Sequence, residues 1–515
     1  MNINDYKIKN AVVSVSDKTG LADFCRELQN LNIKIYSTGG TLKFLEEHKI
    51  DVVSIFEITN FPEILDGRVK TLHSNIHAGI LAELDKENHL KQLLEHNISS
   101  IDMVVVNLYP FEKKLKENCS FEEMIENIDI GGPTLLRSAA KNYKWTLPVV
   151  NPDNYNEIIE HLKANDCKIP LDYRLKLATE VFNYTAYYDS IISKYLNQQI
   201  SNEYPEILTL SYKKSNNLRY GENPHQSAAL YGNFSEIFQK IHGKELSYNN
   251  ILDINSALQL IGEFDEPTCA IIKHTNPCGV ATASNIAEAY KLAFSTDTVS
   301  PFGGIIVFNR NVDKNTAEII HDLFTELIIA PDFDIDALNL LTKKKDRRLI
   351  KANLNEIKSN LSYDIRSIFG GILVQKSDKD LIDDNQLKVV TERIPNPVEL
   401  RSLMFAWKVC KHVKSNAIVY ANEHQTLGIG AGQMSRVDSS RIAVEKAKLM
   451  GLNLNGCVVA SDAFFPFPDG LIEANEAGAT AVIQPGGSIR DNEVIEEANR
   501  RNMAMIFTGI RHFRH

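Results

Sequence analysis

The first 150 residues alternate between short apolar runs, rich in β-branched side chains, and segments with helical periodicity. The apolar runs at 11–15, 33–36, 52–55, 103–106 and 147–150 read as strands, and helices are expected at 21–31 and 41–48. This alternation predicts a doubly wound α/β fold: a parallel sheet with helices on both faces. Ligands bind such folds at the carboxyl ends of the strands, so the loops there are where a site is expected.

Beyond residue 200 the pattern changes. A polar, irregular stretch predicts a linker at 201–217, which separates a first domain (1–200) from a second region (218–515). That region shows strands at 269–273, 304–308 and 457–460 and helices at 397–411 and 439–449, which is compatible with two lobes of similar size. No internal repeat and no low-complexity tract is recognisable in the sequence.

Composition narrows the class of protein. The 515 residues are 43% hydrophobic and 24% charged, without a run of 18 apolar residues, so we expect a cytoplasmic protein with large cores. The seven cysteines contain no C-x-x-C pair, which argues against structural zinc and disulfides. A net charge of −10 argues against nucleic-acid and membrane partners but leaves small anionic ligands open.

Two strand-to-helix turns of the first domain are rich in Gly, Ser and Thr. They read SVSDKTG (14–20) and STGGT (37–41), and each offers backbone N–H groups at a helix N-terminus, where phosphate binds readily. Neither is a Walker A loop, so ATP hydrolysis is not indicated. Each turn alone is also typical of an ordinary βα connection; the pair favours a phosphate site.

Proton-handling side chains follow in three segments of the same domain: GRVKTLH (67–73), NLYPF (107–111) and NIDIGGPTLLRSAAKN (127–142). Lys70, Tyr109, Asp129 and Lys141 would form a useful acid–base group if the fold brought them together. The alternative for the first segment is a solvated basic loop.

In the second region, IIKHTNPCGV (271–280) ends an apolar run with a lysine and a histidine. We expect the charge of Lys273 to keep His274 available as a base near neutral pH. A zinc deaminase signature is absent, because Ala281 stands where the second cysteine belongs and no H-x-E precedes it. Cys278 is more typical of a buried structural cysteine than of a nucleophile.

Several further loops carry candidate binding residues. Arg219 and Tyr220 lie in LRYGENPHQ (218–226), where an arginine suits phosphate or carboxylate recognition. The loops SPFGG (300–304) and FFPFPDG (464–470) could line a flat heterocycle or simply pack on the surface. Asn416 is expected at the start of a strand, and the terminal TGIRHFRH is either functional or a frayed tail.

Taken together, these motifs resemble the bifunctional purine biosynthesis proteins, which join an inosine monophosphate (IMP) cyclohydrolase to an aminoimidazole-carboxamide ribonucleotide (AICAR) transformylase. SVSDKTG, STGGT, GRVKTLH, NLYPF and DIGG…LLRSAAKN are similar to the cyclohydrolase half; RYGENPHQ, KHTNPCG, FGG, SNAIV, AGQMSR, SDAFFPF and the RHF-type C-terminus are similar to the transformylase half. The match runs in the same order from Ser14 to His515.

This resemblance implies a methylglyoxal-synthase-like first domain and two cytidine-deaminase-like subdomains that have lost zinc. It implies a homodimer with shared transformylase sites, small-molecule nucleotide and folate substrates, 10-formyltetrahydrofolate as co-substrate, and no metal beyond a monovalent cation near the transformylase site. In formyl transfer His274 would take the amine proton and Lys273 would assist. Lys70, Tyr109, Asp129 and Lys141 would serve the cyclisation of formyl-AICAR to IMP.

The resemblance also assigns substrate-binding residues. In the first domain these are Ser14, Lys18, Thr19, Ser37, Thr38, Gly39, Thr41, Arg68, Thr71, Asn107 and Gly131. In the second they are Arg219, Tyr220, Asn250, Phe302, Gly303, Asn416, Arg436, Phe465, Arg511 and Phe513. Asn416 would orient the carboxamide, and Arg219 and Arg511 would hold phosphate or carboxamide groups.

Departures from the family pattern are few: Ser74, Thr298 and Pro301 replace residues usual at those places, while Glu326 matches an acidic position. One alternative is an enzyme fused from a deaminase or a methylglyoxal synthase, which zinc content or triose-phosphate turnover would reveal. Another is a non-catalytic purine-nucleotide sensor; intact Lys273, His274, Asp129 and Lys141 argue against it.

Overall fold

The computed structural model describes residues 6–117, 119–360, 363–382 and 386–515. The chain divides into two compact units, Met1–Tyr212 and Lys213–His515, and the boundary falls within the predicted linker. That linker is not irregular to its end, because strand β6 (Lys214–Leu218) pairs with β7 (Ala228–Tyr231). The second unit therefore begins slightly before the predicted residue 218.

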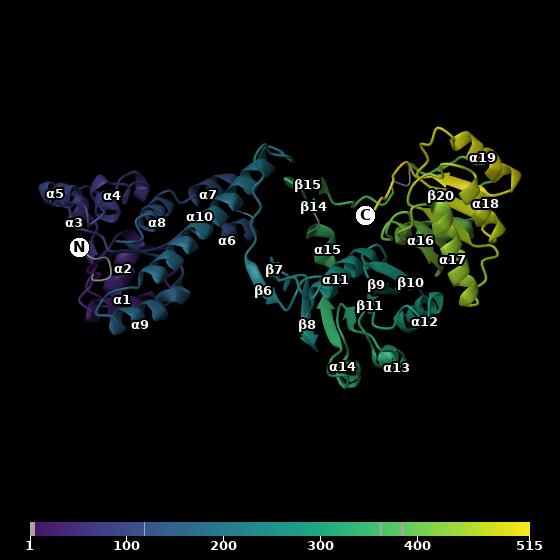
Figure 1. Cartoon of the computed structure of the whole chain (residues 1–515), viewed down its shortest axis with the longest axis horizontal. Helices are drawn as coiled ribbons and strands as arrows, with labels where there is room; N and C mark the ends of the chain where they lie inside the picture. The colour runs from purple at the N-terminus through teal and green to yellow at the C-terminus, as the bar shows by residue number, and fades with distance from the viewer. Residues whose placement is uncertain (1–5, 118, 361–362, 383–385) are drawn as a thin grey trace. The chain divides into compact units, whose positions relative to one another are not determined.

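The first unit contains the predicted parallel sheet, with strand order β3-β2-β1-β4-β5 (Figure 1). Its strands are β1 (Asn10–Val15), β2 (Lys34–Ser37), β3 (Val53–Ser54), β4 (Met103–Asn107) and β5 (Leu147–Val149). All four pairings are parallel. Each strand lies on a predicted apolar run, which confirms the sequence reading of this domain.

Helices cover both faces of this sheet. They are α1 (Leu21–Asn30), α2 (Gly39–Glu47), α3 (Phe56–Thr59), α4 (Ser74–Leu81), α5 (Glu87–Glu95), α6 (Phe111–Lys116), α7 (Phe121–Glu126), α8 (Gly131–Lys141), α9 (Tyr155–Ala164) and α10 (Leu171–Gln199), with 3-10 turns η2 (Leu65–Gly67) and η3 (Pro152–Asn154). Helices α1 and α9 share one buried core with the sheet, and α4 and α8 share the other. Helix α10 contributes to both cores, so it spans the edge of the sheet.

The first lobe of the second unit is a six-stranded mixed sheet of order β10-β9-β11-β12-β13-β8. Its elements are β8 (Phe238–His242), α11 (Tyr248–Ile261), β9 (Thr268–Lys273), β10 (Asn276–Thr282), α12 (Ile286–Thr296), β11 (Ile305–Phe308), α13 (Lys314–His321), β12 (Leu327–Ala330), α14 (Ile335–Leu341) and β13 (Arg348–Ala352), followed by α15 (Leu354–Asn360). Helices α12, α13 and α14 pack on one face of the sheet, and α11 packs on the other.

The second lobe repeats this topology. Its elements are β16 (Lys388–Val389), α16 (Pro397–Cys410), β17 (Ile418–Ala421), β18 (Thr426–Gly430), α17 (Arg436–Leu449), β19 (Val458–Ser461), α18 (Asp469–Glu476), β20 (Ala481–Gln484), α19 (Asp491–Arg500) and β21 (Ala504–Phe507). The order β18-β17-β19-β20-β21-β16 corresponds strand for strand to the first lobe, with the same parallel and antiparallel pairings. The two lobes therefore form a structural repeat that is not recognisable in the sequence, because many different sequences can adopt one topology.

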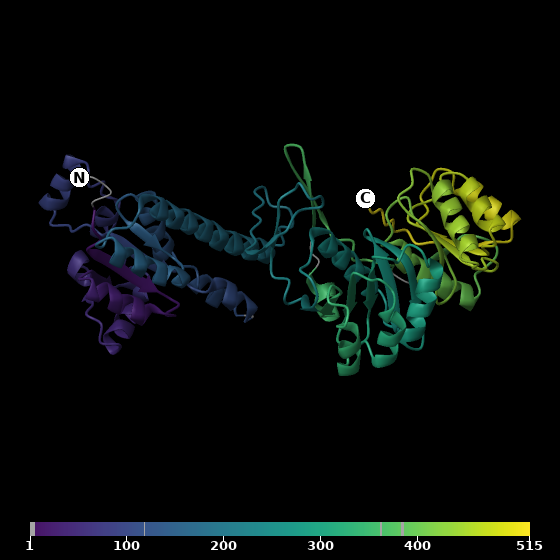
Figure 2. The ribbon, with the colours of Figure 1, turned by 60° about the horizontal axis from the view of Figure 1, so that its bottom comes forward.

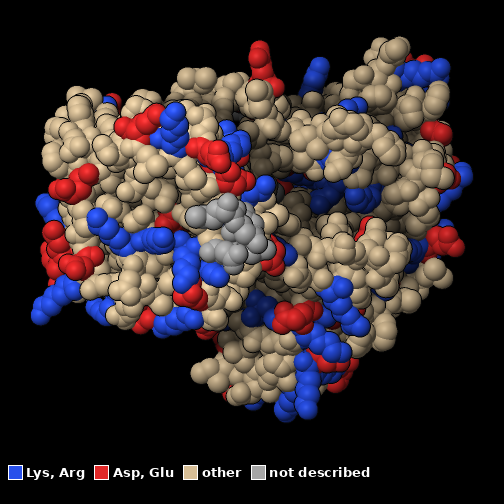
Figure 3. Space-filling model, turned by 60° about the vertical axis from the view of Figure 1, so that its left-hand side comes forward, with Lys and Arg blue, Asp and Glu red and all other residues tan. Residues whose placement is uncertain are grey.

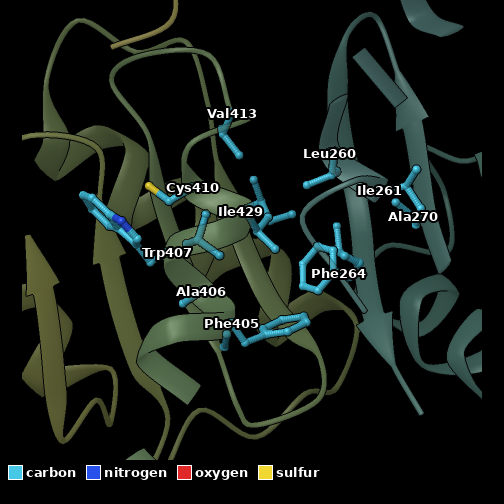
Figure 4. Close-up of a cluster of buried hydrophobic side chains, with 14 of the residues drawn as sticks. Leu260, Ile261, Phe264, Ala270, Phe405, Ala406, Trp407, Cys410, Val413 and Ile429 are labelled. Carbon is cyan, nitrogen blue, oxygen red and sulfur yellow. The ribbon is translucent and has the colours of Figure 1, made fainter. Parts of the chain in front are cut away.

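The two lobes join along an edge strand and through a shared core. A bridge between Ala281 and Gln425 brings β10 beside β18. Helices α11 and α16 lie between the sheets, where the rings of Phe264 and Phe405 are 5.6 Å apart (Figure 4). This common core holds the loops of both lobes in a fixed relation.

One element projects from the second unit. The hairpin of β14 (Tyr363–Ile368) and β15 (Gly371–Lys376) extends away from the body of the lobes (Figure 2). Elsewhere the surface is mixed: acidic and basic side chains are interspersed over the face shown in Figure 3. In the portion of the chain that the structure describes, no helix has the length and apolar character needed to cross a membrane.

Candidate functional sites

The first site lies where the strand order of the parallel sheet reverses, between β1 and β4, which is where such folds bind ligands. The 14–20 turn is held there by Asn107, whose Oδ1 accepts from the N–H groups of Ser16 (2.7 Å) and Asp17 (2.8 Å). Asn107 is buried, so in this structure its side chain braces the turn instead of facing a ligand.

The second turn is braced in the same way. Ser37 Oγ donates to the carbonyl of Val13 (2.7 Å), and Thr41 Oγ1 bonds both the N–H (3.1 Å) and the carbonyl (3.0 Å) of Val15. These hydroxyls fix the two turns against each other. The first N–H groups of α2 have no partner within the helix, so they are the groups suited to bind a phosphate.

A lysine reinforces this helix terminus. Gly39 has φ 53°, and a Cβ placed on it would lie 3.7 Å from Nζ of Lys70. The ammonium group therefore sits beside the positive end of α2, which adds to its attraction for an anion.

Asp129 stands at the start of α8, close to Lys70. Its Oδ1 accepts from the N–H of Gly132 (2.8 Å), and the backbone N–H of Tyr109 also donates to the carboxylate. Burial raises the pKa of Asp129 above its usual value, against these hydrogen bonds and the charge of Lys70. The structure thus brings Asp129 close to Lys70 and to the backbone of Tyr109, while the part of the Tyr109 phenol in proton transfer stays a prediction.

Lys141 ends the 11-residue helix α8 that Gly131 begins, so its backbone lies about 15 Å along the helix axis from the Asp129 end at 1.5 Å per residue. Its membership of the acid–base group stays a prediction. At the near end Gly131 and Thr71 come close, because a Cβ on Gly131 would be 2.9 Å from Thr71 Oγ1.

The remaining predicted residues of this site have mixed surroundings. Arg68 forms an ion pair with Glu126, and Thr38 donates to Glu63, a carboxylate that the sequence did not single out. Thr19 donates to Asp17 (2.7 Å). Ser14 is the penultimate residue of β1 and is half-buried. The ammonium group of Lys18 lies over the ring of Phe44, 5.9 Å from its centroid.

The second site is built around the tip of the β9–β10 hairpin. His274 and Thr275 form its two-residue turn with φ 52° and 64°, the left-handed conformation of a type I′ turn. Asp253 of α11 holds the turn: its carboxylate accepts from Thr275 N–H (2.7 Å) and from His274 N–H. Burial raises the pKa of Asp253. No sequence signal marked it, since only the fold brings it to the turn.

Lys273 points to a neighbouring loop. Its Nζ donates to the carbonyl of Phe302 (2.9 Å), whose ring is 62% exposed and therefore free to contact a ligand. Gly303 follows with φ 75° and donates to the carbonyl of Phe324 (2.9 Å). Asn250 is buried, and its Nδ2 donates to Glu326 (3.0 Å).

Asn276 connects this hairpin to the second lobe. Its Nδ2 donates to the carbonyl of His274 (3.2 Å), and its Oδ1 accepts from the N–H of Lys414 (2.9 Å). Two residues further, Asn416 donates through Nδ2 to the carbonyl of Gln433 (2.9 Å). The predicted base and the predicted carboxamide ligand thus belong to one set of connected loops.

Cations and an aromatic ring complete the second lobe's side of the site. Arg436 donates to the fully buried Asp462 (3.0 Å), and its guanidinium lies over Phe513, 5.7 Å from the centroid. Arg511 lies over the same ring at 4.3 Å. The C-terminal tail is therefore packed against the second lobe and is not a frayed end.

Other candidates fare differently. Phe465 is 1% exposed and packs in the core of the second lobe. Its ring lies so close to Gly470 that a Cβ on that glycine would come within 2.6 Å of it. The prediction that Phe465 contacts substrate is therefore wrong for this structure. Burial raises the pKa of Cys278 to about 12, which removes the thiolate at neutral pH.

Arg219 stacks on the ring of its neighbour Tyr220. Their loop is tied to α11 by Asn249, whose Nδ2 donates to the backbone carbonyl of Glu222 (3.2 Å).

A metal-binding cluster is absent from the described residues, and a cavity of the first lobe lies apart from these sites. Within the described ranges no three His, Cys, Asp or Glu side chains are grouped to bind a metal ion. A cavity of about 680 Å³ opens at the carboxyl ends of β11–β13, lined by residues such as Phe238, Arg310 and Lys351, and no predicted site residue lines it.

A parallel sheet whose switch point presents helix N–H groups and a lysine, followed by a unit with a lysine–histidine hairpin, is the arrangement expected of an enzyme with one centre in each unit. Comparison with known proteins supports this. The MGS-like domain model matches residues 20–134, and the AICARFT/IMPCHase bienzyme model matches residues 139–446. The chain belongs to the AICARFT/IMPCHase bienzyme family.

Full-length relatives agree. The bifunctional purine biosynthesis protein PurH of Caldicellulosiruptor saccharolyticus is 54% identical, and the match covers 98% of this chain and all of the relative. PurH of Chlorobium chlorochromatii is also 54% identical over the whole of both chains. Among solved structures, one described as the crystal structure of ForH is 31% identical over 36% of this chain and 97% of its own, with a TM-score of 0.33. The family is that of a bifunctional purine biosynthesis enzyme, an AICAR formyltransferase and IMP cyclohydrolase.

Proposed function

We propose that the two activities are divided between the two units. The second unit transfers a formyl group from 10-formyltetrahydrofolate to the amine of AICAR, and the first closes formyl-AICAR to IMP. The observation that supports this best is the separation of two acid–base groups: His274 with Lys273 in one unit, and Asp129 with Lys70 in the other.

Formyl transfer needs help because the AICAR amine is conjugated with its ring and is a poor nucleophile. His274, exposed at the hairpin tip, takes the amine proton as the nitrogen attacks the formyl carbon. Lys273 supports the developing oxyanion or protonates the departing folate nitrogen. Collapse of the tetrahedral intermediate leaves formyl-AICAR and tetrahydrofolate.

Substrate would be oriented by the loops around the hairpin. Asn416 holds the carboxamide, and Arg219 and Arg511 bind phosphate or carboxamide groups. The side chains of Tyr220, Phe302, Arg436 and Phe513 line the pocket. The exposed ring of Phe302 and the two arginines over Phe513 are arranged for a flat, anionic ligand.

Cyclisation joins the carboxamide nitrogen to the formyl carbon and releases water. Holding these atoms in contact supplies much of the acceleration, because well-oriented groups reach effective molarities of roughly 10⁵ M or more. The phosphate rests on the 14–19 and 37–41 turns, while Asp129, Lys70 and Tyr109 move protons. Lys141, in the last turn of α8, is the fourth proposed member of this group.

A homodimer with shared transformylase sites is part of the proposal. The β14–β15 hairpin carries exposed apolar side chains, among them Phe369 at 108% and Leu373 at 59%, which suits association with a second copy. Sedimentation of the intact chain should give twice its monomer mass. The cytidine-deaminase-like character of the lobes, a monovalent cation, the absence of zinc and a cytoplasmic location remain predictions from the resemblance.

The proposal is tested by assaying the two half-reactions separately in His274→Ala and Asp129→Asn. Tetrahydrofolate release reports formyl transfer, and IMP formation from supplied formyl-AICAR reports cyclisation. We expect each variant to lose one reaction and keep the other. Loss of both reactions in either variant, or of neither, would refute the division of labour.

A further inference from the structure

A polar cluster lies buried between the lobes of the second unit, outside the residues assigned to substrate. Glu263 follows α11, while Lys411 and His412 follow α16. Oε1 of Glu263 lies 3.0 Å from Nζ of Lys411 and 2.9 Å from Nε2 of His412. His412 and Lys411 are only 6% and 5% exposed, so these groups must satisfy one another.

The protonation states of this cluster fix the direction of its hydrogen bonds. Burial lowers the pKa of His412 to about 4, so its ring is neutral at physiological pH. Burial opposes ionisation of Glu263, but the hydrogen bonds and charges of His412 and Lys411 outweigh it and lower the pKa of Glu263 to about 2. A neutral ring beside a carboxylate donates through Nε2–H, which leaves Nδ1 as an acceptor.

Arg514 supplies the donor for that acceptor. Its Nη1 lies 3.0 Å from Nδ1 of His412. Its Nη2 donates to Oε1 of Gln259 (3.1 Å) and to Oγ of Ser256 (3.3 Å), both on α11. The guanidinium of one tail residue is thereby anchored to α11 and to the segment that follows α16.

The main chain of Arg514 is bound as well. Its N–H donates to Ser415 Oγ (3.0 Å), and its carbonyl accepts from Ser415 N–H (2.9 Å). Ser415 Oγ in turn donates to Asp462 (2.5 Å), the carboxylate that holds Arg436. Ser415 directly precedes Asn416, and Arg514 directly follows Phe513.

We propose that Arg514 is a positioning residue for formyl transfer, which sets the positions of Asn416, Arg436, Arg511 and Phe513 by tying the C-terminal tail to α11, His412 and Ser415. The inference rests on the proposed function of the second unit. A chain end is mobile unless it is bound, and a misplacement of about 1 Å at a reacting centre can reduce a rate about a hundredfold. One anchored residue adjoining three ligand-binding segments therefore affects substrate binding without touching substrate.

The test compares Arg514→Met with Arg514→Lys and with Arg500→Met, a control on an exposed arginine that pairs with Glu497 on α19. For each purified full-length variant we would measure KM for AICAR, KM for 10-formyltetrahydrofolate and kcat of formyl transfer. Cyclisation of formyl-AICAR and thermal unfolding of both units would be measured alongside. Cyclisation is an internal control, because it belongs to the other unit.

We expect Arg514→Met to raise the KM for AICAR about tenfold and to lower kcat, with cyclisation unchanged. Arg514→Lys should recover part of the loss, since it restores a cation but not the planar fork. Arg500→Met should match the wild type.

The inference is overturned if folded Arg514→Met keeps wild-type constants, or if its activity falls only in proportion to the unfolded fraction. Should that variant not fold, unchanged constants in Arg514→Lys overturn it instead. If the wild type and the Arg500→Met control transfer no formyl group, the proposed function fails, whatever Arg514 does.

Discussion

The two lobes of the second unit share one topology but differ at their first hairpins. In the first lobe, β9 and β10 meet in the two-residue turn of His274 and Thr275, with both residues at positive φ. In the second, β17 and β18 are joined by four residues, 422–425, in which Asn422 Oδ1 accepts from the N–H groups of His424 (2.9 Å) and Gln425 (2.8 Å). The first turn is stabilised by a side chain of another element, Asp253 of α11, whereas the second is stabilised by its own residue Asn422.

The helix behind each hairpin explains this difference. Helices α11 and α16 both begin with a capping box, and the sixth residue of each occupies the equivalent place. It is Asp253 in α11, which binds the hairpin turn, and Ser402 in α16, whose hydroxyl donates within its own helix to the Val398 carbonyl (2.8 Å). The repeated fold therefore supplies a scaffold twice, and single side chains decide how the hairpin turn of each copy is held.

The largest expected effect is a difference in the rate of formyl transfer between variants of the two hairpin histidines, His274 and His424. We expect His274→Ala to reduce formyl transfer by about 10² to 10⁴, the usual contribution of a general base. His424→Ala removes the exposed histidine of the other turn and should leave kcat within about twofold, as for most surface changes. Stopped-flow measurement of tetrahydrofolate release decides this; equal losses in both variants would mean that the hairpins are not functionally distinct.

The junction of the lobes should make stability depend on pH. Because the pKa of His412 falls from 6.5 to about 4 on folding, the unfolded chain binds more protons between these values. The free energy of unfolding of the second unit should then fall by up to roughly 3 kcal/mol as pH drops from 6.5 to 4. Glu263, with a pKa of about 2, adds a further loss below pH 4.5.

His412→Gln provides the comparison for that pH effect, since an amide can donate to Glu263 and accept from Arg514 without titrating. Urea denaturation between pH 7 and pH 4.5 should show a flatter profile for this variant than for the wild type. If the unfolding free energies of the two proteins depended on pH in the same way, a group other than His412 would be responsible for the pH dependence.

A smaller effect should distinguish the helices behind the hairpins. Asp253→Ala frees the His274 turn, and we expect kcat of formyl transfer to fall about tenfold, in line with the loss of a charged hydrogen bond. Ser402→Ala should change kcat little. Asp253→Asn keeps an acceptor oxygen and should lie between; a wild-type rate in Asp253→Ala would show that the turn holds its shape unaided.

The smallest effect concerns two thiols, one in each lobe: the half-buried Cys278 and the buried Cys457. Burial raises the pKa of Cys278 and that of Cys457 to about 12. Because neither is ionised at neutral pH, Cys278→Ala and Cys457→Ala should both keep formyl transfer within about twofold and lower the free energy of unfolding by about 1 kcal/mol. A selective rate loss in Cys278→Ala would return this residue to the list of catalytic candidates.

Much of this organisation could be predicted from sequence because it depends on local patterns. The strands of the first unit, the two strand-to-helix turns and the position of His274 at a strand end all follow from runs of neighbouring residues. The burial of Phe465 could not be predicted in this way, because an aromatic loop motif does not reveal whether the ring faces a ligand or the core.

By itself, the sequence determined the class of fold, the family and the side chains capable of acid–base chemistry, because periodicity and motif order are properties of the chain. Only the tertiary structure decided that Asp253 holds the His274 turn, that the lobes repeat one topology and that Arg514 ties the tail to α11 and to the segment after α16. Arg514 contacts residues about 100 and 255 positions away. Contacts over such separations arise from packing of whole elements, and no local pattern encodes them.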